Sequence, residues 1–126
     1  GYAIAKIAVA RMCSYISRQE PQFQYRTLMP CNIYGRFDHF DPVRAHLVPA
    51  IIRKVHEAKR NGHATVEIWG DGTVRREFMY SGDLADAIMM AVEQFESLPD
   101  MMNIGLGFDH SINEYYQAGA AARDYR

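Results

Sequence analysis

Tyr2 and Lys6 are the residues near the start of the sequence whose types and spacing suit acid–base chemistry. They are four residues apart, and residues with this spacing lie one above the other on one face of a helix. The positive charge of an ammonium favours the ionised form of a nearby phenol, so such a tyrosine exchanges a proton readily with a sugar hydroxyl or a carbonyl. We therefore predict a proton-donating pair here. The alternative interpretation is two surface residues on a solvated helix face.

The residues that follow must form the helix that holds this pair. Apolar residues recur at helical spacing through residues 3–18, and Pro21 ends the segment. The pattern is already running at Tyr2, with no cap residue and no preceding turn. A helix without a start signal leads us to expect that the chain continues upstream.

Length and composition argue against several classes of protein. The 126 residues are 48% hydrophobic, which is enough for a core, and they make one domain at most or part of one. The formal net charge of −1 argues against a nucleic-acid partner. No apolar run reaches the ~18 residues of a membrane-spanning helix, and no signal peptide is recognisable, so we expect a cytoplasmic protein without a membrane partner. The 2 cysteines and 5 histidines show no metal-binding spacing, and we predict no metal.

The rest of the sequence alternates between strand and helix patterns. We predict strands at residues 23–29, 66–69 and 101–104, an extended segment at 75–80, helices at 45–61 and 81–96, and a long loop at 31–44. Gly62 is predicted to end the first of these helices, and Gly70-Asp71-Gly72 to form a tight turn. Ser111 and Glu114 form a capping-box pattern that opens a last helix. This order favours an α/β fold with parallel strands, although so few short strands make an incomplete sheet.

Five segments, taken in order, carry a resemblance to a known family. They are Tyr2-Ala-Ile-Ala-Lys6, Met29 to Gly35, His46-Leu-Val-Pro-Ala50, Trp69 to Thr73 continuing through Arg76-Glu77-Phe78, and Asn103-Ile104-Gly105. Together they resemble the C-terminal portion of the GDP-L-fucose synthases, a branch of the extended short-chain dehydrogenases/reductases. The resemblance implies a Rossmann-type α/β fold. Residues 1–126 would then be a single fragment that contains the end of the dinucleotide-binding domain and most of the small substrate-binding region.

The same resemblance implies a reaction and the residues that carry it. Members of the family epimerise two carbons beside the ketone of GDP-4-keto-6-deoxy-mannose and then reduce the ketone with NADPH to form GDP-L-fucose. Tyr2 would donate the proton to the C4 oxygen, and Lys6 would assist it and hold the nicotinamide ribose. His46 would act as an acid in the epimerisation and lie near the nicotinamide.

The remaining implied residues bind cofactor, substrate or a second subunit. The nicotinamide pocket would be lined by Pro30, Cys31, Asn32 and Ile33. Lys54, Trp69 and Arg76 would hold the GDP-linked deoxy-sugar, with cations on phosphate and the indole against the nucleotide. Family members are usually dimers, so a homodimer through the helix that carries Tyr2 and Lys6 is also expected.

Departures from the family pattern leave other functions open. The sequence has no Gly-rich turn for the NADP pyrophosphate, and the family's upstream serine and base cysteine have no counterpart, since neither Cys13 nor Cys31 matches that position. Lys54 stands where arginine is usual. We therefore expect little activity from these 126 residues alone. The alternatives are another NAD(P)-dependent nucleotide-sugar 4-epimerase or 4,6-dehydratase, and a non-catalytic binding module.

Overall fold

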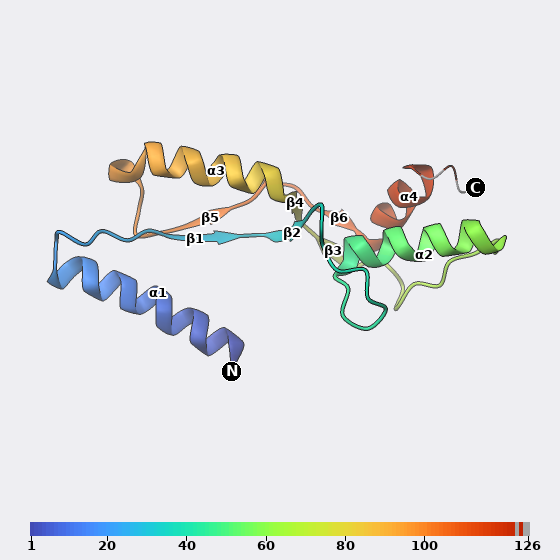
Figure 1. Ribbon diagram of the computed structural model, residues 1–126, viewed down its shortest axis with the longest axis horizontal. Helices are drawn as coiled ribbons and strands as arrows, with labels where there is room; N and C mark the ends of the chain where they lie inside the picture. Colours follow the sequence, from blue (N-terminus) through green and yellow to red (C-terminus); the bar gives the residue numbers. More distant parts are fainter. Residues whose placement is uncertain (123, 125–126) are drawn as a thin grey trace. The chain divides into compact units, whose positions relative to one another are not determined.

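The computed structural model describes residues 1–122 and 124, which form two compact units (Figure 1). Unit 1 consists of Gly1–Cys31 and Asp83–Ile104, and unit 2 of Asn32–Gly82 and the residues from Gly105 onward. The helices are α1 (Tyr2–Gln19), α2 (Leu47–Asn61), α3 (Ser81–Glu93) and α4 (Ile112–Ala122), with a 3₁₀ turn, η1, at Phe95–Ser97. The strands are β1 (Thr27–Pro30), β2 (Asn32–Tyr34), β3 (Arg75–Arg76), β4 (Phe78–Tyr80), β5 (Met101–Ile104) and β6 (His110–Ser111).

Unit 1 contains a parallel pair of strands, β1 and β5, in which Thr27 pairs with Met101 and Pro30 with Ile104. The backbone N–H of Thr27 donates to the Asp100 carbonyl over 2.8 Å, and that of Cys31 to Ile104 over 2.9 Å. Successive N–H groups of a strand point to opposite edges. The N–H groups of Thr27 and Cys31 point to β5, so the position of Pro30 needs no donor towards β5. Pro30 is therefore accommodated as the last residue of β1, one residue beyond the predicted end of the strand.

The predicted strand at residues 23–29 is wrong in its first half. The N–H of Phe23 donates to the Glu20 carbonyl over 2.8 Å, and the N–H of Tyr25 donates to Ser17 Oγ over 3.0 Å. These bonds tie the segment back to the C-terminal end of α1, so its backbone cannot join a sheet.

Unit 2 contains two short strand pairs. β2 runs parallel to β4, with Asn32 paired to Phe78 and Tyr34 to Tyr80. The prediction of an uninterrupted loop over residues 31–44 is therefore wrong at Asn32–Tyr34. β3 and β6 are antiparallel, with Arg76 paired to His110, and the prediction of parallel strands alone missed this pair.

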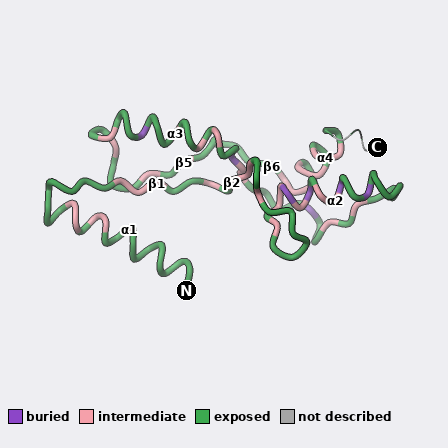
Figure 2. The backbone as a smooth tube through the Cα atoms, in the orientation of Figure 1, coloured by how far each residue is buried: buried purple, intermediate pink, exposed green. Residues whose placement is uncertain are grey.

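The core of unit 2 lies against α2, whose buried face is predicted by its apolar periodicity (Figure 2). Ile51, Val55 and Ala58 are buried together with Met79 of β4, and Val55 is only 1% exposed. α4 packs against α2 at Gly119, where an added Cβ would lie 2.7 Å from Ile51 Cγ2. Only glycine allows the two helices this close approach.

Two predicted helix ends of unit 2 are confirmed, although α2 begins at Leu47 and not at the predicted residue 45. α2 ends at Gly62, which has φ 69. The N–H of Gly62 donates to the carbonyls of Ala58 and Lys59 in the last turn of the helix. At the start of α4, the N–H of Ser111 donates to Glu114 Oε2 over 2.6 Å, and the N–H of Glu114 donates to Ser111 Oγ over 3.1 Å. These two bonds are the reciprocal capping box that the sequence predicts.

The predicted strand at residues 66–69 is wrong. This segment pairs with no strand in the part of the chain that the structure describes. The Glu67 carbonyl instead accepts a hydrogen bond from Lys54 Nζ at 2.9 Å, and Trp69 is exposed. The side chain of Lys54, a residue of α2, is thus hydrogen-bonded to the backbone of this irregular segment.

α1 is an amphipathic helix whose most covered residues, such as Cys13 and Ile16, are only half-buried. None of its residues is buried, and Ile4, Ile7, Met12 and Tyr15 are all exposed. Among the described residues, no helix combines the length and apolar character that crossing a membrane requires.

Candidate functional site

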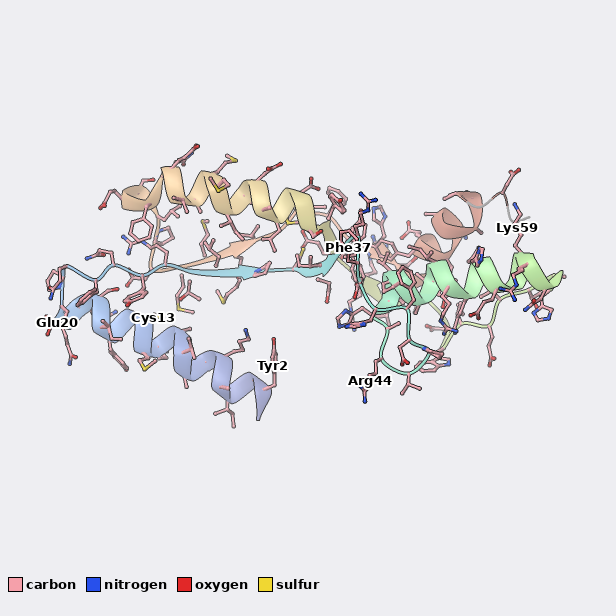
Figure 3. All side chains as sticks on the ribbon, in the orientation of Figure 1. Tyr2, Cys13, Glu20, Phe37, Arg44 and Lys59 are labelled. Carbon is pink, nitrogen blue, oxygen red and sulfur yellow. The ribbon has the colours of Figure 1, made fainter. Side chains whose placement is uncertain are left out.

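Tyr2 and Lys6 lie on one face of α1, as their spacing predicts. α1 begins at Tyr2, and the N–H of Ala5 donates to the Gly1 carbonyl over 3.1 Å, which makes the first turn regular. Lys6 Nζ is 5.6 Å from the centroid of the Tyr2 ring, a cation–π distance. The Tyr2 side chain is 79% exposed and extends from the first turn (Figure 3). The ammonium therefore stands beside a phenol that is free to meet another molecule.

A pocket of about 710 Å³ in unit 1 brings this pair together with the end of β1. Tyr2 and Lys6 line it from α1, Pro30 and Cys31 from the chain at the end of β1, and Met101 from β5. Four residues predicted from the sequence to contact one cofactor thus share one pocket. Its other lining residues are Ile7, Ala10, Arg11, Thr27, Leu28 and Met29.

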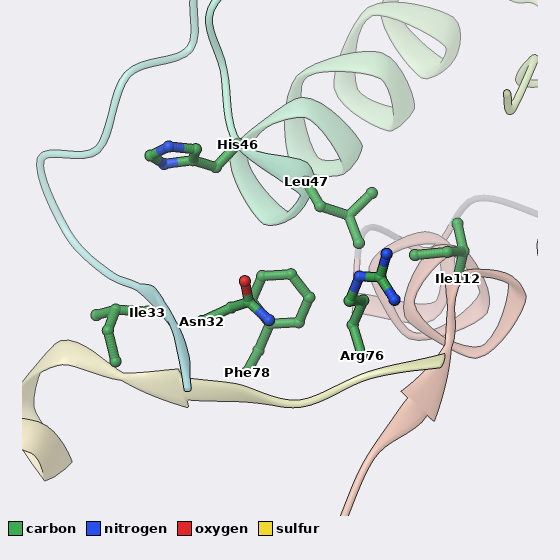
Figure 4. Close-up of a pocket in the computed structure, with 7 residues that line it drawn as sticks. All are labelled: Asn32, Ile33, His46, Leu47, Arg76, Phe78 and Ile112. Carbon is green, nitrogen blue, oxygen red and sulfur yellow. The ribbon is translucent and has the colours of Figure 1, made fainter. Parts of the chain in front are cut away.

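A second pocket, of about 350 Å³, lies in unit 2 (Figure 4). It is lined by Asn32 and Ile33 of β2, His46 and Leu47 at the start of α2, Arg76 of β3, Phe78 of β4 and Ile112 of α4. The predicted cofactor run from Pro30 to Ile33 is therefore divided, because its first two residues belong to the pocket of unit 1 and its last two to this one. His46 and Arg76, predicted for different roles, share the second pocket.

His46 is the residue that precedes α2, with extended backbone dihedrals of φ −67 and ψ 170. This conformation turns its side chain away from the helix axis, and Figure 4 shows the imidazole beside the pocket. His46 Nδ1 lies 3.7 Å from Asp38 Oδ1, and the His46 side chain is 77% exposed whereas that of Asp38 is 18% exposed. Asp38 also accepts a 2.7 Å bond from the N–H of His39. Sequence reasoning missed Asp38, since nothing in the spacing of an irregular loop marks an acid that faces His46.

Arg76 is oriented by the short antiparallel pair that contains it. Its neighbour Arg75 points to the other side of the strand, where its Nε lies 2.8 Å from Asp109 Oδ1. That carboxylate raises the pKa of Arg75 above its ordinary value. The Tyr115 hydroxyl donates to the Arg76 carbonyl over 2.9 Å, and Arg76 Nη1 donates to the Arg75 carbonyl over 2.9 Å. The guanidinium of Arg75 is thus paired with Asp109, whereas Arg76 lines the second pocket.

Glu77 has a positioning role that the sequence did not reveal. Its carboxylate accepts hydrogen bonds from the backbone N–H groups of Leu106 and Gly107, the latter over 2.9 Å. Its backbone carbonyl accepts from Asn32 Nδ2 over 2.9 Å. The Arg76-Glu77-Phe78 segment thus fastens the loop after β5 and also holds a pocket residue of β2.

Lys54 and Trp69 lie together, apart from both of these pockets. Lys54 Nζ is 5.5 Å from the centroid of the Trp69 ring, and the indole is 86% exposed. Lys54 lines a separate hollow of about 230 Å³ that includes Glu57, His63 and Glu67. The structure therefore joins two of the predicted substrate residues, and the third, Arg76, lines the same pocket as His46. Among the described residues, no cluster of three or more acids, histidines and cysteines could hold a metal.

The model of the NAD dependent epimerase/dehydratase family matches residues 1–105 of this chain. The chain belongs to this family. The match includes the Tyr2/Lys6 helix, both strand pairs that run parallel, and the residues of the second pocket except Ile112. It confirms the predicted α/β fold class.

Curated relatives narrow the resemblance. The chain is 48% identical over 126 residues to a GDP-L-colitose synthase from Yersinia pseudotuberculosis, covering 100% of the chain and 41% of the relative. It is 52% identical over 116 residues to the GDP-L-fucose synthase of Azorhizobium caulinodans, covering 92% of the chain and 37% of the relative. The predicted resemblance to the GDP-L-fucose synthases is thus confirmed. The chain spans about two fifths of the length of these relatives.

A solved structure gives the same fold. The GDP-mannoheptose C4 reductase MlghC of Campylobacter jejuni, solved with NADP bound, superimposes with a TM-score of 0.81 and is 32% identical. The alignment covers 97% of this chain and 46% of that one. The similarity is to a protein described as a C4 reductase that acts on a GDP-sugar.

Proposed function

We propose that this chain supplies the proton donor and the substrate-binding region of an NADPH-dependent GDP-sugar epimerase/reductase. The specific reaction is 3,5-epimerisation and 4-reduction of GDP-4-keto-6-deoxy-mannose to GDP-L-fucose. One observation carries the proposal: Tyr2 and Lys6 open onto one pocket with Pro30 and Cys31. The similarity to an NADP-bound GDP-sugar C4 reductase and to GDP-L-fucose synthases supports it.

The first pocket fits the nicotinamide end of NADP(H). It offers an ammonium, a phenol and an apolar wall formed by residues such as Ile7 and Leu28, and its volume of about 710 Å³ accommodates a ring and part of a sugar. NADPH bound there supplies the hydride. The hydroxyl of Tyr2 gives its proton to the C4 oxygen of the sugar, so no alkoxide accumulates. The ammonium of Lys6 stabilises the phenolate that remains and hydrogen-bonds the ribose.

The second pocket supplies groups that suit the sugar and the diphosphate. His46 gives a proton to the sugar carbon, on the face opposite the base, during epimerisation. The carboxylate of Asp38 lies near Nδ1 of His46. The guanidinium of Arg76 offers two parallel donors to a phosphate. Trp69 presents an aromatic face to the guanine, with Lys54 on its ring. The exposed apolar stripe of α1 supports a homodimer through the same helix.

A simpler reaction is the second candidate. The similarity to the Campylobacter reductase favours reduction of a GDP-linked 4-keto sugar at C4 without epimerisation. The two candidates share Tyr2 and Lys6 and differ in whether His46 takes part. Product stereochemistry separates them, and it also separates both from a 4-epimerase or a 4,6-dehydratase.

A chimera tests the proposal. The matched segment of the Azorhizobium synthase is exchanged for this chain, and the host supplies the rest of the enzyme. With NADPH and GDP-4-keto-6-deoxy-mannose, we expect GDP-L-fucose, identified by NMR of the product. Reduction without inversion at C3 and C5 would support the second candidate. If a folded chimera binds NADPH but oxidises none of it with this sugar, the proposal is wrong.

His46→Gln in this chimera tests the role of the histidine. We expect solvent-deuterium incorporation beside the ketone to continue while the inverted product falls about 10²-fold, because loss of a general acid costs at least this much. His56→Gln is the matched control, since His56 lies on the exposed side of α2 and lines neither of the two candidate pockets. Inversion by His46→Gln at the parental rate would remove His46 from the mechanism.

A further inference from the structure

Trp69 is the only tryptophan of the chain, and it is 86% exposed. An indole buries a large apolar surface when it packs in a core, so one that is held in solvent requires a reason. The segment that carries Trp69 is nevertheless well anchored. The anchoring contacts come from both sides of the segment and from different helices.

Asn113 of α4 makes the anchoring contact after Trp69. Its backbone N–H donates to the Gly72 carbonyl over 3.0 Å, and its side-chain Nδ2 donates to the Asp71 carbonyl over 3.1 Å. The preceding residue, Ile112, donates its N–H to the Val74 carbonyl over 3.0 Å. The first turn of α4 thus uses backbone donors that have no partner within the helix to hold the segment.

The backbone at Gly72 is shaped to receive Asn113. Gly72 is buried with φ 72, and a Cβ added there would lie 2.0 Å from Asn113 Oδ1. Gly70 has nearly the same dihedral, φ 75, but no atom of the described residues lies within 4 Å of its added Cβ. The left-handed backbone therefore serves the turn at both glycines, whereas the close contact with Asn113 occurs at Gly72 alone.

Two further contacts stiffen the segment. Asp71 Oδ1 accepts from the Thr73 N–H at 3.0 Å and from the Thr73 hydroxyl at 2.8 Å, and these bonds lower the pKa of Asp71. On the other side of Trp69, Lys54 Nζ holds the Glu67 carbonyl and lies over the indole ring. The backbone is thus hydrogen-bonded on either side of a side chain that is itself exposed.

We propose that Asn113 is a positioning residue that holds residues 70–72 so that Trp69 presents a fixed aromatic face to the purine base of a nucleotide-sugar. The inference rests on the proposed function, because it takes a guanine nucleotide as the ligand. Stacking gains most when the aromatic ring is ordered before binding, since no side-chain or loop entropy is then lost. Asn113 would act through Trp69 and would not touch the reacting sugar.

The intrinsic fluorescence of Trp69 gives a direct assay in this chain. We expect GDP to quench it saturably and UDP to quench it more weakly, because a purine stacks over a larger area than a pyrimidine. In Asn113→Ala, the Kd for GDP should rise roughly fivefold, the effect of losing one neutral hydrogen bond. Gln117→Ala is the matched control, since it removes an exposed amide one turn further along α4.

A kinetic measurement separates positioning from general structural damage. In the chimera, Asn113→Ala should raise the KM for the GDP-sugar and leave kcat unchanged, since the reacting groups stay in place. Asn113→Asp, which keeps the shape but loses the Nδ2 donor, should do the same if Asn113→Ala folds poorly.

The outcomes distinguish failure of the role given to Asn113 from failure of the proposed function. If GDP quenches the parent chain and Asn113→Ala binds it equally well, the role of Asn113 is refuted while the proposed function stands. If GDP leaves Trp69 of both the parent chain and the chimera unaffected although the chimera turns over the GDP-sugar, Trp69 is no stacking surface and the inference fails. If the chimera neither binds nor turns over the sugar, both fail.

Discussion

Replacement of Gly72 by alanine probes the contact between the Trp69 segment and α4 most sharply. The new methyl must adopt φ near 72 and would lie 2.0 Å from Asn113 Oδ1, with Asn113 Cγ at 2.5 Å. The side chain of Asn113 therefore has to leave, and its bond to the Asp71 carbonyl is lost. Gly70→Ala is the control, because it has φ 75 in the same turn and no atom of the described residues within 4 Å.

The expected cost follows from two separate effects. Alanine in the left-handed region costs about 1 kcal/mol, and both variants pay it. Loss of the Asn113 side-chain hydrogen bond adds about 1 kcal/mol, with about another 0.5–1 for the displaced amide. We therefore expect Gly72→Ala to lower the free energy of unfolding by about 2.5–3 kcal/mol and Gly70→Ala by about 1 kcal/mol.

Urea unfolding followed by far-UV circular dichroism, which reports on the helices, measures both values. The double variant Gly72→Ala/Asn113→Ala adds a decisive comparison. In the double variant the hydrogen bond is lost only once and no amide is displaced, so its destabilisation should fall short of the sum of the single variants by about 1.5–2 kcal/mol. Equal effects of Gly70→Ala and Gly72→Ala, or strict additivity in the double variant, would refute the proposed contact.

Three further predictions concern other contacts in unit 2. The N–H and the hydroxyl of Ser111 lower the pKa of Glu114, so the stabilisation by this carboxylate is present above its ordinary pKa and is lost as the pH falls through the lowered value. In Glu114→Gln, the free energy of unfolding should therefore fall less steeply as the pH is lowered through the acid range. Glu77→Gln keeps the shape of a carboxylate that accepts two backbone N–H groups, and it should cost about 1–2 kcal/mol and speed hydrogen exchange of Leu106. Asp38→Asn in the chimera should slow epimerisation about tenfold with reduction unchanged, because the acid that faces the imidazole is neutralised.

Each of these has its own contradicting result. An equally steep fall in Glu114→Gln would show that the capping box carries no charge effect. Parental exchange rates in Glu77→Gln would leave the loop after β5 without this anchor. Equal losses of epimerisation and reduction in Asp38→Asn would mean that the acid supports the fold and not the histidine.

Local signals in the sequence predicted local structure well. The capping box at Ser111 and Glu114 and the C-terminal glycine of α2 were both predicted, because a helix end is determined by the side chains within one turn of it. The spacing of Tyr2 and Lys6 likewise predicted their shared face of α1. In each case the partners lie four or fewer residues apart.

Features that depend on distant partners were missed or misplaced. β2 and β6 are only three and two residues long, too short for a periodic pattern, and each exists because a strand far along the chain pairs with it. The false strand at residues 66–69 has the apolar alternation but pairs with no strand among the residues that the structure describes. Propensity cannot report whether a partner is present.

The candidate site shows the same division. The family resemblance predicted Tyr2, Lys6, Pro30 and Cys31 for one environment, and they line one pocket. It did not predict that Asn32 and Ile33 line another pocket, because only the pairing of β2 with β4 places them there. Asp38, Glu77 and Asn113 escaped notice for a related reason, since each acts on a residue at least eight positions away.

The central claim is that the hydroxyl of Tyr2 delivers the proton during reduction of a GDP-linked keto-sugar. Its most direct test is the rate of NADPH oxidation by the chimera carrying Tyr2→Phe, with Tyr15→Phe as the control, since Tyr15 is an exposed tyrosine of the same helix outside the pocket. We predict a fall in kcat of about 10²–10⁴-fold for Tyr2→Phe, with NADPH still bound, and no change for Tyr15→Phe. Reduction by Tyr2→Phe at the parental rate would contradict the account.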